Sequence, residues 1–188
     1  MPRPMPALKA GTMDLHRRVE SAAPMAALNA GTVTHAAYMR ALALLYGFYR
    51  PLEGVLAPHL AALGVAPKHP ALAADLATLG VADVAALPLC AVLPRADGAA
   101  AAVGCAYVLE GPTLGGRVIL RSLPDRLEAP PAVGGYAFYG FYDDAEAAWR
   151  RFGRALATRL DWDDAAEAQA VTAARETFAA LLDWVEAN

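Results

Sequence analysis

One stripe of large apolar side chains runs through the first third of this 188-residue sequence. Its members recur every three or four positions, which is the period of an α-helix that buries one face. They are Tyr38, Leu42, Leu45, Tyr49, Leu52, Leu56, Leu60 and Leu63. Pro51 lies inside the stripe and is expected to kink this helix without ending it. The stripe therefore predicts one long helix with a continuous buried face.

The rest of the chain also favours helices. Hydrophobic residues make up 57% of the sequence, largely as Ala and Leu, and Ala is the strongest helix former. No segment alternates as a strand would. We expect one all-α domain over residues 1–188, with residues 1–6 as a flexible N-terminus. Its other helices are expected at 7–22, 99–120 with an interruption near Pro112, 144–160 and 163–187, with short helices within 64–98 and an irregular segment at 123–142.

Composition argues against several classes of partner. The net charge of −3 offers no basic field for nucleic acid. Charges, Gly and Pro interrupt every apolar run before it reaches the length of a membrane span, and the first six residues lack the apolar core of a signal peptide. Cys90 and Cys105 form neither a metal-binding spacing nor a disulfide framework. We therefore expect a cytoplasmic protein that binds neither membranes nor nucleic acid.

His16 lies on the first expected helix, beside the face that is buried. Leu15 and Val19 belong to the buried stripe, whereas Lys9, His16 and Glu20 form a second stripe about 100° away. A histidine that binds haem iron offers one ring nitrogen to the metal and needs the other oriented by an acceptor, which Glu20 can supply. Lys9 can reach a carboxylate at the edge of the ligand. The alternative is an ordinary surface histidine among solvated charges.

A strip of glycines interrupts the helix expected at 99–120. Gly104, Gly111 and Gly115 fall on one helical face, and Gly116 widens the strip. Each glycine costs about 0.5–1 kcal/mol relative to alanine in a helix, and Pro112 adds a missing N–H. These costs suggest that the backbone must approach a ligand closely. The alternative is a plain break between two shorter helices.

Basic and aromatic side chains near the C-terminal half could complete a pocket. Arg150, Arg151 and Arg154 lie on the flank of their helix opposite its apolar stripe, where they could pair with ligand carboxylates or simply be solvated. Tyr49 belongs either to the core or to the pocket. The same two alternatives hold for an aromatic run consisting of Tyr136, Phe138, Tyr139, Phe141 and Tyr142. Together with His16 and the glycines, these residues suggest a haem held between two helices.

Three segments of the chain resemble the haem oxygenase family, and together they touch most of its length. They are residues 9–54, with His16, Glu20, Gly31-Thr32-Val33-Thr34 and Leu45-Tyr46-Gly47-Phe48-Tyr49, residues 107–120, and residues 135–141. The first resembles the proximal helix and the Tyr-rich helix after it, the second the glycine-kinked distal helix, and the third the aromatic segment before the basic helix. The run Tyr107-Val108-Leu109-Glu110-Gly111 is most similar to bacterial members, including those associated with bacteriophytochromes.

The resemblance implies a helical bundle that holds haem between a proximal helix and a kinked distal helix. It implies an oxidoreductase that uses O2 and an external electron donor, such as a reductase or a ferredoxin, to open haem to biliverdin with release of iron and CO. A bacteriophytochrome could accept the biliverdin. By the resemblance His16 is the axial ligand and Glu20 orients it. Gly111, Gly115 and Gly116 line the distal face, and the candidates for contacts with the propionates are Lys9, Arg150, Arg151 and Arg154. Tyr49 is a further candidate for contact with the haem.

One departure from the family pattern bears on the chemistry. Many members carry an aspartate directly after the glycine that matches Gly111, where it holds the water that delivers protons, and this chain has Pro112 there. Thr113, Glu110 or a tyrosine could anchor that water instead. Two alternatives to the enzyme therefore stay open, a non-catalytic haem-binding or haem-transfer protein on the same fold and a thiaminase-like helical enzyme acting on another small molecule.

Overall fold

The fold is a helical bundle, which the computed structural model describes for residues 3–29, 33–127 and 134–188. Its helices are α1 (Met5–Ser21), α2 (His35–Leu63), α3 (His69–Thr78), α4 (Ala99–Glu110), α5 (Pro112–Arg126), α6 (Ala145–Arg159) and α7 (Asp164–Ala187), with two short 3-10 helices at Met25–Asn29 and Val84–Ala86. Within these ranges the structure contains no strand, only an isolated bridge between Val33 and Leu127. The all-α prediction is confirmed.

Helix α2 is the centre of the core. Every member of its apolar stripe is buried. The helix begins where the Thr34 hydroxyl accepts a hydrogen bond from the Ala37 N–H (3.1 Å), and it ends at Gly64, whose φ of 67° is left-handed. Pro51 and Pro58 both lie inside it without ending it.

Helix α1 packs along α7 and runs in the same direction. Gly11 lies against Val171, and further along the two helices the His16 ring meets the Phe178 ring edge-on, with 5.7 Å between centroids. A Cβ at Gly11 would overlap the Val171 side chain. Arg175 also donates to the Asp14 carboxylate (2.8 and 3.1 Å). These contacts fix the position of α1 on α7 at several levels.

Helix α4 packs even more closely on the same helix, again in the same direction. At Gly104 a Cβ would overlap the backbone carbonyl of Ala170 and lie 2.8 Å from the Ala174 N atom. The sequence placed Gly104 on the same face as the glycines after residue 110, but the structure turns it toward α7. The reason is that close helix packing, and not a ligand, requires a bare backbone at this position.

Substitution of Gly104 by alanine is expected to lower the free energy of unfolding by about 1–3 kcal/mol, because the new methyl group meets backbone that cannot rotate away. The matched control is Gly54→Ala on α2, where a Cβ would meet nothing within 4 Å. That change should raise stability by about 0.5–1 kcal/mol through helix propensity. Urea unfolding of both variants checks the pair, and equal effects would contradict the close approach of α4 to α7.

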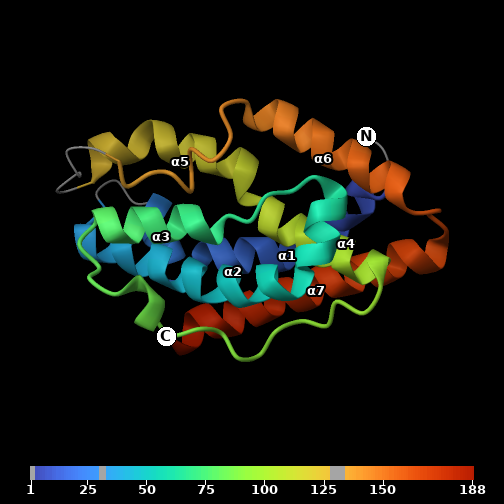
Figure 1. The fold of residues 1–188 in the computed structure, drawn as a ribbon, viewed down its shortest axis with the longest axis horizontal. Coiled ribbons are helices and arrows are strands. Elements are labelled where there is room, and N and C mark those ends of the chain that lie inside the picture. The colour runs from blue at the N-terminus through green and yellow to red at the C-terminus, as the bar shows by residue number, and fades with distance from the viewer. Residues whose placement is uncertain (1–2, 30–32, 128–133) are drawn as a thin grey trace.

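The helix expected at 99–120 is two helices. Helix α4 ends at Glu110 and α5 begins at Pro112 and continues to Arg126, so the first residues of the segment expected to be irregular are helical. In Figure 1, α5 and α6 lie along the upper edge of the molecule and α7 along the lower edge, with α1, α2 and α4 between them. Helix α5 packs mainly against α6, with smaller contacts to α4 and to the 3-10 helix at Met25–Asn29.

The start of the chain differs from the expectation of a flexible arm at residues 1–6. Helix α1 begins at Met5, which is buried. Arg3 donates to Glu167 (2.8 Å) and Asp164 (2.6 Å) on α7. Residues 1 and 2 lie outside the described residues.

Candidate functional site

The His16 side chain is half-exposed and paired with Glu20. Its ring Nδ1 lies 3.4 Å from the Glu20 Oε2 atom, and 44% of the side chain is accessible. Phe178 supports one edge of the ring. Since the carboxylate faces Nδ1, Nε2 is the nitrogen that is left for a metal.

The break between α4 and α5 lies at about the same height in the bundle as His16. Gly11 and Gly104 contact the same turns of α7, and both of their helices run parallel to it. His16 is five residues beyond Gly11 and Gly111 is seven residues beyond Gly104. At a rise of 1.5 Å per residue, His16 lies about 8 Å beyond Gly11 along α1, and Gly111 lies about 10 Å beyond Gly104 along α4. Helix α5 therefore begins close to the level of the imidazole.

One face of α5 is open at this level. Gly111, Gly115 and Val118 share that face through their spacing of four and three residues. A Cβ at Gly115 would meet nothing within 4 Å, and the Val118 side chain is 68% exposed. Leu114 is also exposed beside them. An accessible apolar face with a bare backbone at its centre suits a flat apolar ligand.

Gly116 has a different environment from Gly115. A Cβ at Gly116 would lie 3.0 Å from the Tyr139 ring, so this glycine packs against the aromatic segment before α6. The glycine strip indicated by the sequence therefore divides into packing positions, Gly104 and Gly116, and an open position, Gly115. Gly111 forms the junction between the two helices.

The basic candidates all lie on the surface. Lys9 is exposed on α1, and Arg150, Arg151 and Arg154 are exposed on α6. Arg150 is 3.5 Å from Glu146 one turn earlier, which is a weak solvated pair. The structure leaves all four side chains accessible to a ligand carboxylate. The side chain of Thr113 lies outside the described part of the structure.

Tyr49 lies in the core and is almost completely buried. Its hydroxyl donates to the Leu109 carbonyl (3.1 Å), and its ring meets Phe138 edge-on. Burial raises the pKa of the Tyr49 phenol well above its usual value. Of the two alternatives that the sequence left open, the structure places this tyrosine in the core.

Tyr107 lies near the site, although the sequence named it only as the first residue of the segment that resembles the distal helix. Its ring packs beside Trp149 of α6 with 5.8 Å between centroids, and its hydroxyl interacts with Thr12 of α1. Burial raises the pKa of this phenol. Tyr107 therefore connects three helices one turn before the break. Its position three residues before Glu110 gave no signal, because the partners come from distant parts of the chain.

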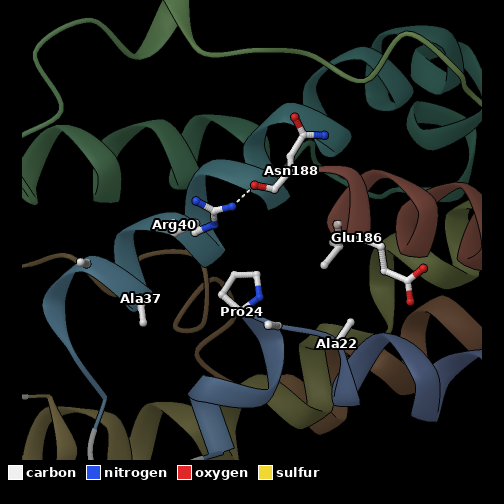
Figure 2. Close-up of a pocket in the computed structure, with 9 residues that line it drawn as sticks. Ala22, Pro24, Ala37, Arg40, Glu186 and Asn188 are labelled. Carbon is white, nitrogen blue, oxygen red and sulfur yellow. Dashed lines mark hydrogen bonds between the residues drawn. The ribbon is translucent and has the colours of Figure 1, made fainter.

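A cavity of about 610 Å³ lies away from these residues, between the end of α1, the start of α2 and the end of α7. Figure 2 shows Arg40 reaching the Asn188 carbonyl at its mouth, with alanines and Pro24 along its wall. None of the sequence-predicted site residues lines it, and its lining contains no imidazole or thiolate that could hold iron. Among the described residues no cluster of three His, Cys, Asp or Glu side chains could form a metal site of another kind.

Comparison with known proteins identifies the family to which this chain belongs. The family model described as "Heme oxygenase" matches residues 5–187, so the chain belongs to the haem oxygenase family. A haem oxygenase from Xanthomonas campestris pv. campestris (strain 8004) is 40% identical over 112 residues, which are 60% of this chain and 63% of that protein. The recognition made from the sequence is confirmed.

Solved structures confirm the fold. A haem oxygenase from Leptospira interrogans superposes with a TM-score of 0.76 at 18% identity, covering 96% of this chain and 97% of that one. Haem oxygenase-1 from the cyanobacterium Synechocystis sp. PCC6803, solved in complex with haem, gives a TM-score of 0.72 at 20% identity, covering 96% and 89%. In the described part of this chain, no helix has both the length and the apolar character needed to cross a bilayer.

Proposed function

We propose that this chain binds haem between α1 and α5 and opens it to biliverdin, with O2 and an external electron donor, releasing iron and CO. The observation that carries the proposal is the His16–Glu20 pair on α1 at the level of the open face around Gly115 on α5. Membership of the haem oxygenase family supports the same reaction over a thiaminase-like activity. Bound haem supplies the redox-active iron, and its own porphyrin is the substrate.

The residues present fit this ligand. The donor set offers one imidazole with a carboxylate behind it, as a haem ligand requires. The open space at Gly115 allows the α5 backbone to approach the porphyrin face. Lys9, Arg150, Arg151 and Arg154 are the cations proposed to pair with the two propionates and to stop the ring from rotating.

Within this proposal each residue has a limited task. His16 holds the iron through Nε2, and Glu20 fixes the orientation of the imidazole. Gly111, Gly115 and Gly116 keep α5 close to the ligand, with Gly116 acting through its contact with Tyr139. Pro112 can neither accept nor donate a proton, so Thr113 and ordered water are proposed to handle protons near the break between α4 and α5. The partners proposed are a reductase or ferredoxin, and a bacteriophytochrome as biliverdin acceptor, in a cytoplasmic setting.

Single-turnover reduction in air tests the reaction. The ferric haem complex of the wild-type chain, given ascorbate or a ferredoxin system with catalase present, is expected to lose its Soret band and yield biliverdin, identified by mass. Catalase excludes ring opening by free peroxide. The alternative is a haem-binding or haem-transfer protein without catalytic activity, which the absence of a carboxylate at Pro112 favours. In that case the haem should survive many reducing equivalents.

A further inference from the structure

A buried ion pair lies where α4 ends. The Lys68 and Glu110 side chains are only 3% and 1% exposed, and the Lys68 ammonium contacts the Glu110 carboxylate directly. Two buried charges are expensive to desolvate, so their pairing needs a geometric explanation beyond stability. The sequence offered Glu110 as an anchor for water, and in the structure its carboxylate is paired with Lys68.

The pair occupies the point where the helix ladder is interrupted. Pro112 has no N–H, and the Gly111 N–H is shared between the carbonyls of Tyr107 (3.0 Å) and Val108 (3.3 Å). The next carbonyl, that of Leu109, accepts hydrogen bonds from the Lys68 Nζ (3.1 Å) and from the Tyr49 hydroxyl (3.1 Å). A cation and a phenol therefore cap the C-terminal end of α4.

Lys68 is itself held in place from α2. The Glu53 carboxylate, also buried, accepts the backbone N–H of Lys68 (2.7 Å) and of His69 (3.0 Å) and contacts His69 Nδ1 (2.7 Å). Glu53 thus caps the first turn of α3. This fixes the position from which Lys68 reaches across to α4.

The other side of the pair reaches the segment before α6. The Tyr142 hydroxyl lies 3.4 and 3.3 Å from the two carboxylate oxygens of Glu110. The Lys68 ammonium lies over the rings of Phe141 (5.8 Å) and Tyr142 (5.5 Å). One ion pair therefore connects the start of α3, the end of α4 and the aromatic segment before α6. That segment also contains Tyr139, which packs against Gly116 of α5.

We propose that Lys68 and Glu110 are positioning residues that set the direction in which α5 leaves α4, and with it the height of the Gly115 backbone above the ligand. The reason lies in the rest of the bundle. Because α1 and α4 are both fixed on α7 at Gly11 and Gly104, the separation of His16 from α5 depends on the angle at the break. The ligand part of this proposal rests on the proposed function, whereas the geometric part does not.

The test begins with the apo-protein, so it does not depend on haem binding. Lys68→Met alone leaves a buried carboxylate without its cation and is not expected to fold well. The double variant Lys68→Met/Glu110→Leu removes both charges at similar volume. Its amide hydrogen exchange over residues 111–120 should be about tenfold faster than in the wild type, because the Lys68 cap and the ion pair at the break are lost, while α2 is unchanged.

Two further variants sharpen the result. Lys68→Arg keeps the cation and should retain most of the protection of α5, whereas Arg3→Met removes an exposed ion pair and should leave α5 unaffected. In haem-loaded protein the double variant should keep the His16-ligated spectrum but show a shifted or split CO stretching band in the ferrous–CO complex. Unchanged exchange in α5, or faster exchange throughout the molecule, would overturn the proposal. Failure of the wild-type chain to bind haem would instead overturn the proposed function and leave the exchange result standing.

Discussion

The variant His16→Ala is expected to lose the axial-imidazole spectrum of the ferric haem complex completely. No second imidazole can replace the ligand from α1, since His16 is the sole histidine of residues 5–21. Exogenous imidazole should restore the spectrum in part. The His16 side chain is half-exposed, so the space that its ring leaves in the variant is open to solvent. Visible absorption during titration with haemin measures both effects.

The matched control is His59→Ala. His59 lies near the C-terminal end of α2 and lines a small cavity between α2, α4 and Leu160. Its substitution is expected to leave the spectrum unchanged. Glu20→Ala should keep the ligand but weaken haem affinity by about 10–100-fold, as loss of an orienting partner does at metal sites. An unchanged spectrum in His16→Ala would remove this residue from the site.

Gly115→Leu is expected to separate stability from function. A leucine in place of glycine should raise the free energy of unfolding of the apo-protein by about 0.5–1 kcal/mol, because helix propensity improves and the site around Gly115 is open. The same side chain would occupy the space proposed for the porphyrin. Haem affinity and biliverdin formation should therefore fall severely in a protein that is more stable than the wild type.

The neighbouring glycine provides the contrast. Gly116→Ala places a methyl group 3.0 Å from the Tyr139 ring, so it should destabilise the apo-protein by about 1 kcal/mol while affecting haem binding less. Denaturant unfolding and haemin titration of both variants give the comparison. Normal haem binding by Gly115→Leu would show that the open face of α5 is not the ligand face.

Local patterns allowed most of the fold to be predicted. The stripe on α2 is fully buried, Thr34 caps that helix, and Asp144 and Asp163 cap α6 and α7 next to the expected starts. These features depend on spacing and capping within a few residues, which the sequence states directly. The relation of His16 to Glu20 is of the same kind.

Features that depend on contacts between distant segments were not predictable. The helical wheel put Gly104 with Gly115, but α4 and α5 are separate helices, and only the packing of α7 shows which glycine is enclosed. Lys68 and Glu110 are 42 positions apart, so no local pattern joins them. The one local signal was Glu110, the only charged residue of α4. A carboxylate at the end of an apolar helix indicates a buried acid that needs a cationic partner.

Three kinds of observation support the proposed haem site between α1 and α5: the spacing of His16 and Glu20, the family membership and the open face at Gly115. Lys9 and the three arginines of α6 are accessible, but their individual pairing with propionates depends on how the ring is rotated. In the proposed reaction, that rotation would also determine which bridge carbon is opened.

A crystal structure of the ferric haem complex tests the central claim most directly. The account predicts iron bonded to the Nε2 atom of His16, the porphyrin lying between α1 and α5, and the backbone at Gly115 against its opposite face. Haem seated elsewhere, for example in the cavity beside Arg40 and Asn188, or iron bonded to any side chain other than His16, would contradict it.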